Sequence, residues 1–387
     1  MIQNELCDSE TVLKCNSLDG KPQLDSFLNK DGLMLRTYGW IVKNAIGIII
    51  LIHGLNSHVR FSFLRHNVDI VGNEKAILKD ENNYYVYKDS WVERFNKTGY
   101  SVYGIDLQGH GKSDGWENLK VNVKRFDDIA YDVIEYIQKI QEKSGKNENS
   151  CDAPPSGDNK SVTKKALPTY LIGQSMGGNV VLRTLQLIGK SKDEAKKKLN
   201  IKGCISLSGM ISIERIIASP RSFKYKLFYL PFTRLFSFCF PRLRLINNMR
   251  YIKYQYMHDL YNYDKIRYKK GITYRFAYEL LKAMDNLQKD MKHIPKDIPI
   301  LFIHSKDDTL CYYRGVVSFF SRLKNDNKEL HILEDMEHML TVEPGNENVL
   351  NKIMQWLSKL NPKRVTTKFK KKKKKKKNSK GQDNSTT

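Results

Sequence analysis

The segment around Ser175 places a hydroxyl group where it can act as a nucleophile. An apolar run, TYLIG, leads into Gly173-Gln174-Ser175-Met176-Gly177, and a helical pattern, NVVLRTLQLIG, follows. A G-x-S-x-G turn between a strand and a helix requires small flanking residues, because the serine adopts a strained backbone conformation. The serine would lie at a helix N-terminus, where free N–H groups and the helix dipole favour a developing negative charge. We therefore interpret Ser175 as a nucleophile rather than as part of a glycine-rich loop.

A serine hydroxyl is a poor nucleophile unless a base removes its proton, so this interpretation requires an acid and a histidine further along the chain. The apolar run at 298–303 is followed by two carboxylates, Asp307 and Asp308, and the run at 328–333 is followed by His338 in a loop. The carboxyl ends of strands in an open α/β sheet meet at one edge, where sites form. Taken singly, these residues are typical of a solvated turn and a surface loop. Together they predict His338 as a general base that Asp307 or Asp308 orients.

Two backbone N–H groups are candidates for stabilising the charge on an attacked carbonyl oxygen. His53 and Gly54 follow the run AIGIIILI and open a tight turn that aims the N–H of Leu55 at the site. With the N–H of Met176 it would form an oxyanion hole, in which one donor typically contributes about 3 to 4 kcal/mol to the transition state. We expect His53 itself to be structural. His331 lies inside a predicted strand, and we expect it to pack there or to face solvent.

Short apolar runs alternate with helical patterns along most of the chain. Near-continuous apolar strands bounded by Gly, Pro or charged residues are typical of a sheet that is buried on both faces. The segment 126–140 has an apolar stripe at helical spacing, with acidic residues outside the stripe. This pattern predicts an α/β fold with a mostly parallel, doubly wound sheet and helices on both faces. The predicted strands lie at 45–52, 100–106, 169–173, 201–208, 298–303 and 328–333.

The 387-residue chain has a formal net charge of +24, and most of it lies in two segments. Residues 361–387, which include the run Lys370–Lys377, carry 12 positive charges and one negative charge. A lysine run repels itself and buries nothing, so it predicts a disordered tail. Residues 210–290 carry 16 positive and six negative charges and are rich in aromatic residues. They interrupt the strand–helix alternation, and we interpret them as a cap over the site. The alternative is a helical subdomain with its own small core.

The boundaries of these segments give the expected domain organisation. The catalytic core should be continuous in space but interrupted in sequence by the cap. A polar, Gly- and Pro-containing stretch within it predicts a long surface insertion. The expected segments are an N-terminal extension at 1–24, a core at 25–209 and 291–360 with its insertion at 142–168, the cap at 210–290, and the tail at 361–387.

Several classes of protein are disfavoured by what the sequence lacks. No run of about 18 apolar residues occurs, and the N-terminus lacks the pattern of a signal peptide, so we expect a cytoplasmic protein. The six cysteines form no CxxC pair, which predicts reduced thiols and neither a zinc site nor a disulfide framework. A lysine run without interleaved aromatic residues gives only sequence-blind attraction to nucleic acid, so no specific nucleic-acid partner is expected.

Five ordered motifs resemble the monoglyceride lipase and lysophospholipase branch of the α/β-hydrolases, over roughly residues 25–360. The Lys- and Asn-rich insertions resemble the lysophospholipase-like set of malaria parasites. The resemblance implies an α/β-hydrolase fold, no metal or organic cofactor, and a cap between the same two strands as residues 210–290. The motifs are HGLNSHVRF at 53–61, GIDLQGHGKSDG at 104–115, GQSMGG at 173–178, HSKDDTLC at 304–311 and EHMLTVE at 337–343.

Carried over by position, the resemblance implies Ser175 as nucleophile and His338 as base, with Leu55 and Met176 as oxyanion donors. The family pattern H-G-x-x-D falls on residues 304–308, which favours Asp308 over Asp307 as the acid. Ser305 stands where that pattern has glycine. The resemblance also implies that three residues shape the loop beside the site rather than catalyse: Asp106, His110 and Ser113.

These observations predict a serine esterase that acts on single-chain lipids, with lysophospholipid ahead of monoacylglycerol. The stretch at 227–241 carries one charge in fifteen residues and suits an acyl chain or a membrane interface. The cap and the lysine tail are therefore also candidates for contact with an anionic membrane, which would make the protein peripheral. The alternatives are a broad carboxylesterase or thioesterase for short acyl groups, and a catalytically silent hydrolase fold.

Overall fold

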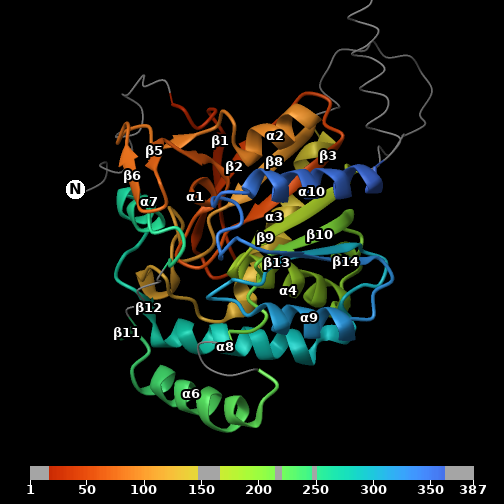
Figure 1. Cartoon of the computed structure of the whole chain (residues 1–387). Coiled ribbons are helices and arrows are strands. Elements are labelled where there is room, and N and C mark those ends of the chain that lie inside the picture. Colours follow the sequence, from red (N-terminus) through yellow and green to blue (C-terminus); the bar gives the residue numbers. More distant parts are fainter. Residues whose placement is uncertain (1–16, 147–165, 214–219, 246–250, 362–387) are drawn as a thin grey trace, which may run out of the picture.

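The computed structural model describes residues 17–146, 166–213, 220–245 and 251–361 (Figure 1). Most of the predicted N-terminal extension, the middle of the predicted insertion, and the lysine tail from 362 onward lie outside these residues. In the described segments, no helix has the length and apolar character that crossing a lipid bilayer requires.

A sheet of eight strands forms the centre of the molecule. Its six consecutive parallel strands are the six runs predicted from the sequence, and two antiparallel strands, which were not predicted, extend one edge. In spatial order the strands are β1 (Gln23–Leu28), β2 (Met34–Trp40), β8 (Tyr100–Ile105), β3 (Gly47–Ile52), β9 (Thr169–Gln174), β10 (Ile201–Leu207), β13 (Ile300–Ser305) and β14 (Lys328–Leu333).

Helices cover both faces of this sheet, as the apolar strands predicted (Figure 1). Alternate residues of β3 belong to two hydrophobic cores, one on each face, because successive side chains of a strand point to opposite sides. One core packs against α3 (Phe126–Lys146), α4 (Met176–Lys190) and α9 (Tyr313–Arg322). The other packs against α1 (Val59–Phe63), α2 (Trp91–Thr98) and α10 (Asn346–Leu360).

The helix before the predicted insertion extends further than the sequence suggested. We placed the start of the insertion at residue 142, but α3 continues through that point to Lys146. Glu142, Lys143 and Ser144 are polar yet compatible with a helix, so polarity alone set the boundary too early. The smaller elements include a helix, α5 (Glu194–Lys197), and two hairpins made of β4 (Arg65–His66) with β7 (Tyr85–Val86) and β5 (Val68–Val71) with β6 (Lys75–Leu78).

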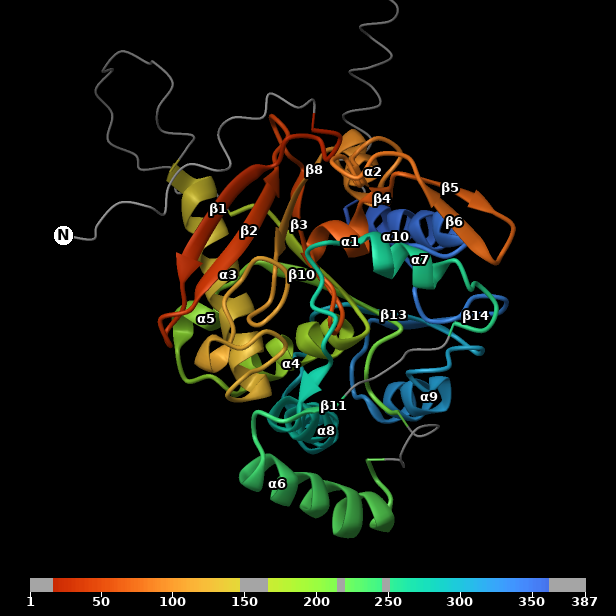
Figure 2. The ribbon, with the colours of Figure 1, turned by 90° about the vertical axis from the view of Figure 1, so that its left-hand side faces the viewer.

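The described residues of 210–290 contribute their buried apolar side chains to the two cores of the body. Their elements are a π-helical turn (Tyr225–Tyr229), α6 (Leu230–Cys239), β11 (Arg244–Leu245), α7 (Met257–Tyr263), β12 (Ile272–Thr273) and α8 (Tyr274–Lys289). The buried side chains of α8 join the core of α3 and α4, and those of α7 join the opposite core. The helix α6 has no buried residue and lies as an extra layer over α8 (Figures 1 and 2).

A buried arginine connects α8 to the sheet-covering helices. Arg183 of α4 binds Asp127 of α3 with two parallel hydrogen bonds of 2.8 and 2.7 Å, and its third nitrogen donates to Asp290 at the end of α8. The guanidinium side chain is 4% exposed. Bidentate pairing of this kind fixes orientation as well as distance. Arg183 therefore sets how the cap helix α8 sits on the body.

We predict that Arg183→Ala lowers the free energy of unfolding by about 2 to 4 kcal/mol, because it removes the cation that binds the carboxylate of Asp127 and leaves Asp290 with the partly exposed Lys190 alone. Lys190→Ala is the matched control. Lys190 also pairs with Asp290, but its side chain is 39% exposed, so its loss should cost less than about 1 kcal/mol. Urea unfolding measures both. Equal effects of the two substitutions would contradict the structural role given to Arg183.

Candidate active site

Ser175 occupies a strained turn between β9 and α4. Its backbone has φ 56° and ψ −119°, a conformation that residues other than glycine rarely adopt. The turn has no room for side chains on either side: a Cβ on Gly173 would lie 2.1 Å from the carbonyl oxygen of Gly177, and one on Gly177 would lie 2.3 Å from that of Ile52. The neighbouring strand holds the turn, because the N–H of Ser175 donates to the carbonyl of Leu207 at 2.8 Å. The side chain of Ser175 is thereby presented at the carboxyl edge of the sheet.

The structure brings Ser175, His338 and Asp308 together. Nε2 of His338 lies 2.8 Å from Oγ of Ser175, and Nδ1 lies 2.8 and 3.0 Å from the two carboxylate oxygens of Asp308. Asp308 is fully buried and His338 is 3% exposed. With Nδ1–H donating to Asp308, Nε2 is free to accept the serine proton. This is the arrangement that activates a serine hydroxyl for attack on a carbonyl.

The turn after β13 selects Asp308 over Asp307. Oδ1 of Asp308 accepts the backbone N–H groups of Leu310 at 2.9 Å and Cys311 at 2.8 Å, which directs the carboxylate inward. Asp307 is exposed and its carboxylate contacts the N–H of Asp335. Only Asp308 therefore reaches the histidine.

Opposing effects set the pKa values of this pair. Burial alone would raise the pKa of Asp308, but the His338 ring and a hydrogen bond from His304 outweigh it, and the pKa lies well below its usual range. Burial alone would lower the pKa of His338, but the negative charge of Asp308 and its hydrogen bond outweigh that effect and raise the pKa above its usual value. Asp308 thus stays ionised at neutral pH and stabilises an imidazolium at His338.

Two residues that the sequence did not assign to the site hold the histidine loop. Both carboxylate oxygens of Glu343 accept backbone N–H groups, one from Glu337 and one from Met339, each at 2.6 Å. These amides flank His338 on both sides. Ser305, at the position where the family pattern has glycine, donates its hydroxyl to the carbonyl of Met336 in the same loop. EHMLTVE had been singled out as a motif, but it gave no sign that its last residue folds back onto its first.

The loop after β3 lies against the serine. A Cβ on Gly54 would lie 3.1 Å from Cβ of Ser175, so the backbone leading into Leu55 passes beside the nucleophile. Among the residues that the structure describes, no acceptor takes up the N–H of Leu55 or of Met176. Both remain available to an oxyanion, as the sequence predicted, and that role stays a prediction.

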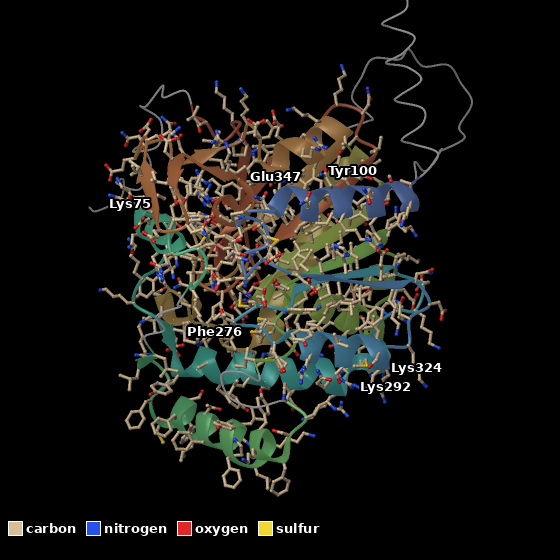
Figure 3. The ribbon with its side chains drawn as sticks, viewed as in Figure 1. Lys75, Tyr100, Phe276, Lys292, Lys324 and Glu347 are labelled. Atoms are coloured by element: carbon tan, nitrogen blue, oxygen red, sulfur yellow. The ribbon has the colours of Figure 1, made fainter. Side chains whose placement is uncertain are left out.

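His53, Asp106 and His110 hold loops beside the site. The ring of His53 is buried, donates to the carbonyl of Gly54 and accepts the N–H of Leu107 at 2.9 Å. Burial lowers the pKa of His53, and likewise that of His110, to about 3, so both rings are neutral. The ring of His110 packs against Phe276 at the start of α8, with ring centres 5.8 Å apart (Figure 3).

Asp106 connects the two loops that border the site. Its carboxylate accepts the N–H groups of Val59 and Lys112 and the hydroxyl of Tyr38, each at 3.0 Å. Ser113 donates to the backbone carbonyl of Asp106. None of these contacts reaches Ser175. His331, the other histidine considered, lies half-buried in β14.

A cavity of about 370 Å³ opens from Ser175 and His338. One face of α8 lines it with Ala277, Leu280, Leu281 and Met284, which recur at helical spacing. Most of the remaining lining is also apolar, and α6 contributes Thr233. Among the described residues that line the cavity, none is Asp, Glu, Lys or Arg. The space therefore suits an extended apolar group whose polar end lies at the serine.

In the described part of the chain, no group of three or more His, Cys, Asp or Glu side chains is placed to hold a metal ion. The three cysteines described, Cys204, Cys239 and Cys311, are free thiols.

The family model of the serine aminopeptidases, S33, matches residues 82–153 and 157–345. The chain belongs to this family. Human monoglyceride lipase is 23% identical over 261 residues, which cover 66% of this chain and 73% of that one. A soluble variant of monoglyceride lipase from Saccharomyces cerevisiae, solved with a substrate analogue, superposes with a TM-score of 0.63 at 18% identity over 88% of this chain and 95% of its own.

A highly thermostable carboxyl esterase from Bacillus coagulans, solved with glycerol, gives a TM-score of 0.61 at 15% identity over 88% and 98% of the two chains. The fold is that of an α/β-hydrolase, as the sequence predicted. The family match and these relatives make the chain a monoglyceride lipase-like hydrolase. The resemblance to the malaria-parasite set stays a prediction.

We predict that Glu343→Gln slows the labelling of Ser175 by a fluorophosphonate about tenfold, because the amide of glutamine can accept from only one of the two N–H groups that flank His338. Burial raises the pKa of Glu343 to about 7, and the double contact requires the ionised form. The labelling rate of the wild type should therefore fall at acid pH as two groups, His338 and Glu343, become protonated. In the variant only the protonation of His338 remains. It should occur at lower pH, because the negative charge of Glu343 no longer raises the pKa of His338.

Glu334→Gln is the control for this experiment. Glu334 lies in the same loop, but its side chain is exposed and pairs with Lys306. Its removal should leave the pH profile unchanged. An unaltered profile for Glu343→Gln would show that Glu343 serves folding alone.

Proposed function

We propose that the protein is a serine hydrolase that cleaves carboxylic esters of single-chain lipids through an acyl-enzyme on Ser175. The observation that carries this proposal is the position of His338, which lies 2.8 Å from both the serine hydroxyl and the Asp308 carboxylate at the base of an apolar cavity. The family, and relatives named as monoglyceride lipases, support it.

The proposed reaction has two steps. In the first, Oγ of Ser175 attacks the ester carbonyl while its proton passes to Nε2 of His338, and the imidazolium then donates that proton to the leaving alcohol. In the second, His338 takes a proton from water, the hydroxide attacks the acyl-enzyme, and the fatty acid leaves as the serine recovers its proton. The N–H groups of Leu55 and Met176 would bind the carbonyl oxygen as its charge develops in each step.

The cavity favours a neutral head group. Its polar lining includes the hydroxyls of Ser57, Ser62 and Tyr261, and among the described lining residues none is Asp, Glu, Lys or Arg. Hydroxyls can bind a glycerol group, whereas a phosphate would enter without a cation. We therefore place monoacylglycerol ahead of lysophospholipid, which reverses the order expected from the sequence.

Two alternatives differ from this proposal in what they predict. A broad esterase or thioesterase for short acyl groups would make no use of the apolar face of α8. A catalytically silent fold would not react with serine-directed reagents, and the buried, fully paired Asp308 and His338 argue against it. Each alternative is separated from the proposal by one of the experiments below.

We predict that the wild type releases fatty acid from monoacylglycerol, more slowly from lysophosphatidylcholine and lysophosphatidylserine, and that Ser175→Ala lowers these rates by about 10³-fold or more. The measurement is fatty-acid release across the three lipids, with fluorophosphonate labelling alongside. Ser113→Ala is the control, since this hydroxyl lies in the adjacent loop without contact to His338. Equal labelling of the wild type and Ser175→Ala would end the proposal.

We predict that Leu280→Trp lowers kcat/KM for long-chain monoacylglycerols at least about tenfold, while hydrolysis of an acetate ester is retained, because the larger side chain fills the cavity beyond the carbonyl. Tyr278→Trp is the matched control: Tyr278 lies on the same helix but lines a second, separate hollow between α6 and α8. A profile over acyl lengths measures both variants. A wild type that loses rate as the acyl chain lengthens would favour the broad esterase.

A further inference from the structure

Glu337, the residue before His338, carries a buried carboxylate that the proposed reaction does not use. The residue is 3% exposed. One carboxylate oxygen accepts the backbone N–H of Ile252 at 3.1 Å, and the other accepts the N–H of Lys253 at 3.2 Å. Hydrogen bonds to an ionised carboxylate are stronger than those between neutral groups. Glu337 therefore fastens a distant stretch of the chain, which lies just before α7, to the residue that adjoins the base.

The same stretch contacts the histidine loop at a second point. The backbone carbonyl of Asp335 accepts the ammonium group of Lys253 at 2.9 Å and the hydroxyl of Tyr254 at 3.0 Å. The carboxylate of Asp335 also pairs with Lys253 at 3.2 Å, but the side chain of Asp335 is 92% exposed. Exposed ion pairs contribute little to stability, because solvent screens them. The buried carboxylate of Glu337 is therefore the stronger attachment.

The stretch before α7 is itself fixed to the body of the protein. Tyr251 and Tyr254 are buried in the core that also contains the apolar side chains of α7. Directly after α7, the carboxylate of Asp264 accepts the hydroxyl of Tyr85 at 2.7 Å and lies 3.0 Å from Nε2 of His58. Both side chains of the Asp264–His58 pair are fully buried. Residues 251–264 are thus held at both ends without help from His338, and they can support the histidine loop.

Glu337 also places negative charge beside the base. Burial would lower the pKa of His338, but the charges of Asp308, Glu343 and Glu337 outweigh it and raise that pKa above its usual value. Burial, to which the charge of Glu337 adds, raises the pKa of Glu343 to about 7. In the described part of the chain, the other titratable side chains that face these carboxylates are Lys253, Tyr254 and Asp335 beside Glu337, Tyr251, Tyr256 and Tyr261 beside Glu343, and His304 and Cys311 beside Asp308.

We propose that Glu337 is a positioning residue of the hydrolase: by binding residues 252 and 253 it holds His338 within proton-transfer distance of Ser175, and its charge stabilises the imidazolium that forms there. This inference rests on the proposed function. Among the described residues that line the cavity, Glu337 is absent, so its effect reaches the substrate only through His338.

The test is Glu337→Gln in the full-length chain. Fluorophosphonate labelling of Ser175 at neutral pH should slow about five- to tenfold, because a glutamine amide can accept from only one of the two N–H groups. For an acetate ester and a long-chain monoacylglycerol alike, kcat should fall while KM stays unchanged, since the cavity is untouched.

The pH profile separates this role from a purely structural one. Labelling requires a neutral His338 and an ionised Glu343. In Glu337→Gln both protonations should remain in the acid limb, and both should move to lower pH, because the charge that raises the two pKa values is gone.

Asp335→Asn is the matched control. It makes the same change of charge in the same loop, but at an exposed side chain, and asparagine tolerates the φ of 68° at this position. Its labelling rate and pH profile should equal those of the wild type. Glu337→Asp retains the charge with a shorter reach, so it should label more slowly than the wild type with the acid limb in its original place.

A Glu337→Gln variant that keeps the wild-type pH profile overturns the inference, even if urea unfolding shows that it is less stable. Should that variant not fold, Glu337→Asp decides, and wild-type labelling by Glu337→Asp overturns the inference as well. A wild type that is not labelled at all contradicts the proposed function itself. A labelled wild type with an unaltered Glu337→Gln contradicts only the role of Glu337.

Discussion

The backbone of Ser175 is the constraint on which the site depends. A residue other than glycine at φ 56° and ψ −119° is held at a cost of about 1 to 3 kcal/mol, and it persists only where its surroundings leave no alternative. Here β9 enters the turn and α4 leaves it, and the backbones of β3 and α4 pass too close for any side chain at Gly173 or Gly177. The central parallel strands therefore do two things: they form the core, and they hold the turn at Ser175 in its strained conformation.

The histidine is fixed by contacts of a different kind. Its ring is held between Ser175 and Asp308, whereas its backbone is held by the Glu343 carboxylate on both sides. The ring contacts decide which nitrogen carries the proton. The backbone contacts decide where the ring can be, because a loop without regular secondary structure has no ladder of hydrogen bonds to place it. Two buried carboxylates near one imidazole also favour its charged form, which is the form that appears when the serine is deprotonated.

The sequence was most informative where one physical rule dominates. The six parallel strands are buried on both faces and therefore read as apolar runs, and Ser175 is marked by the glycines its turn requires. The edge strands β1 and β2 were not predicted, because QLDSFL and MLRTYGW mix polar and apolar residues on a partly exposed edge. Asp308 could be separated from Asp307 only by the turn that directs one carboxylate inward. The contacts of Glu343 could not be predicted, because the carboxylate binds backbone N–H groups and every residue type except proline has one. Aromatic content marked residues 210–290 as a separate segment of the sequence, but composition does not say that α7 and α8 would extend the two cores of the body while α6 stays outside.

That division of the cap has a mechanical consequence. α8 is held by a buried arginine and by eight buried side chains, so moving it would disturb the body of the protein. α6 has no buried side chain and packs mainly on α8. Local stability follows the amount of apolar surface an element buries, so α6 can separate from α8 at a lower free-energy cost than any neighbouring helix of comparable length. Since Thr233 of α6 lines the cavity, a helix without a buried residue forms part of the cavity wall. The triad residues, in contrast, follow strands whose side chains belong to the two cores, so their positions do not depend on α6.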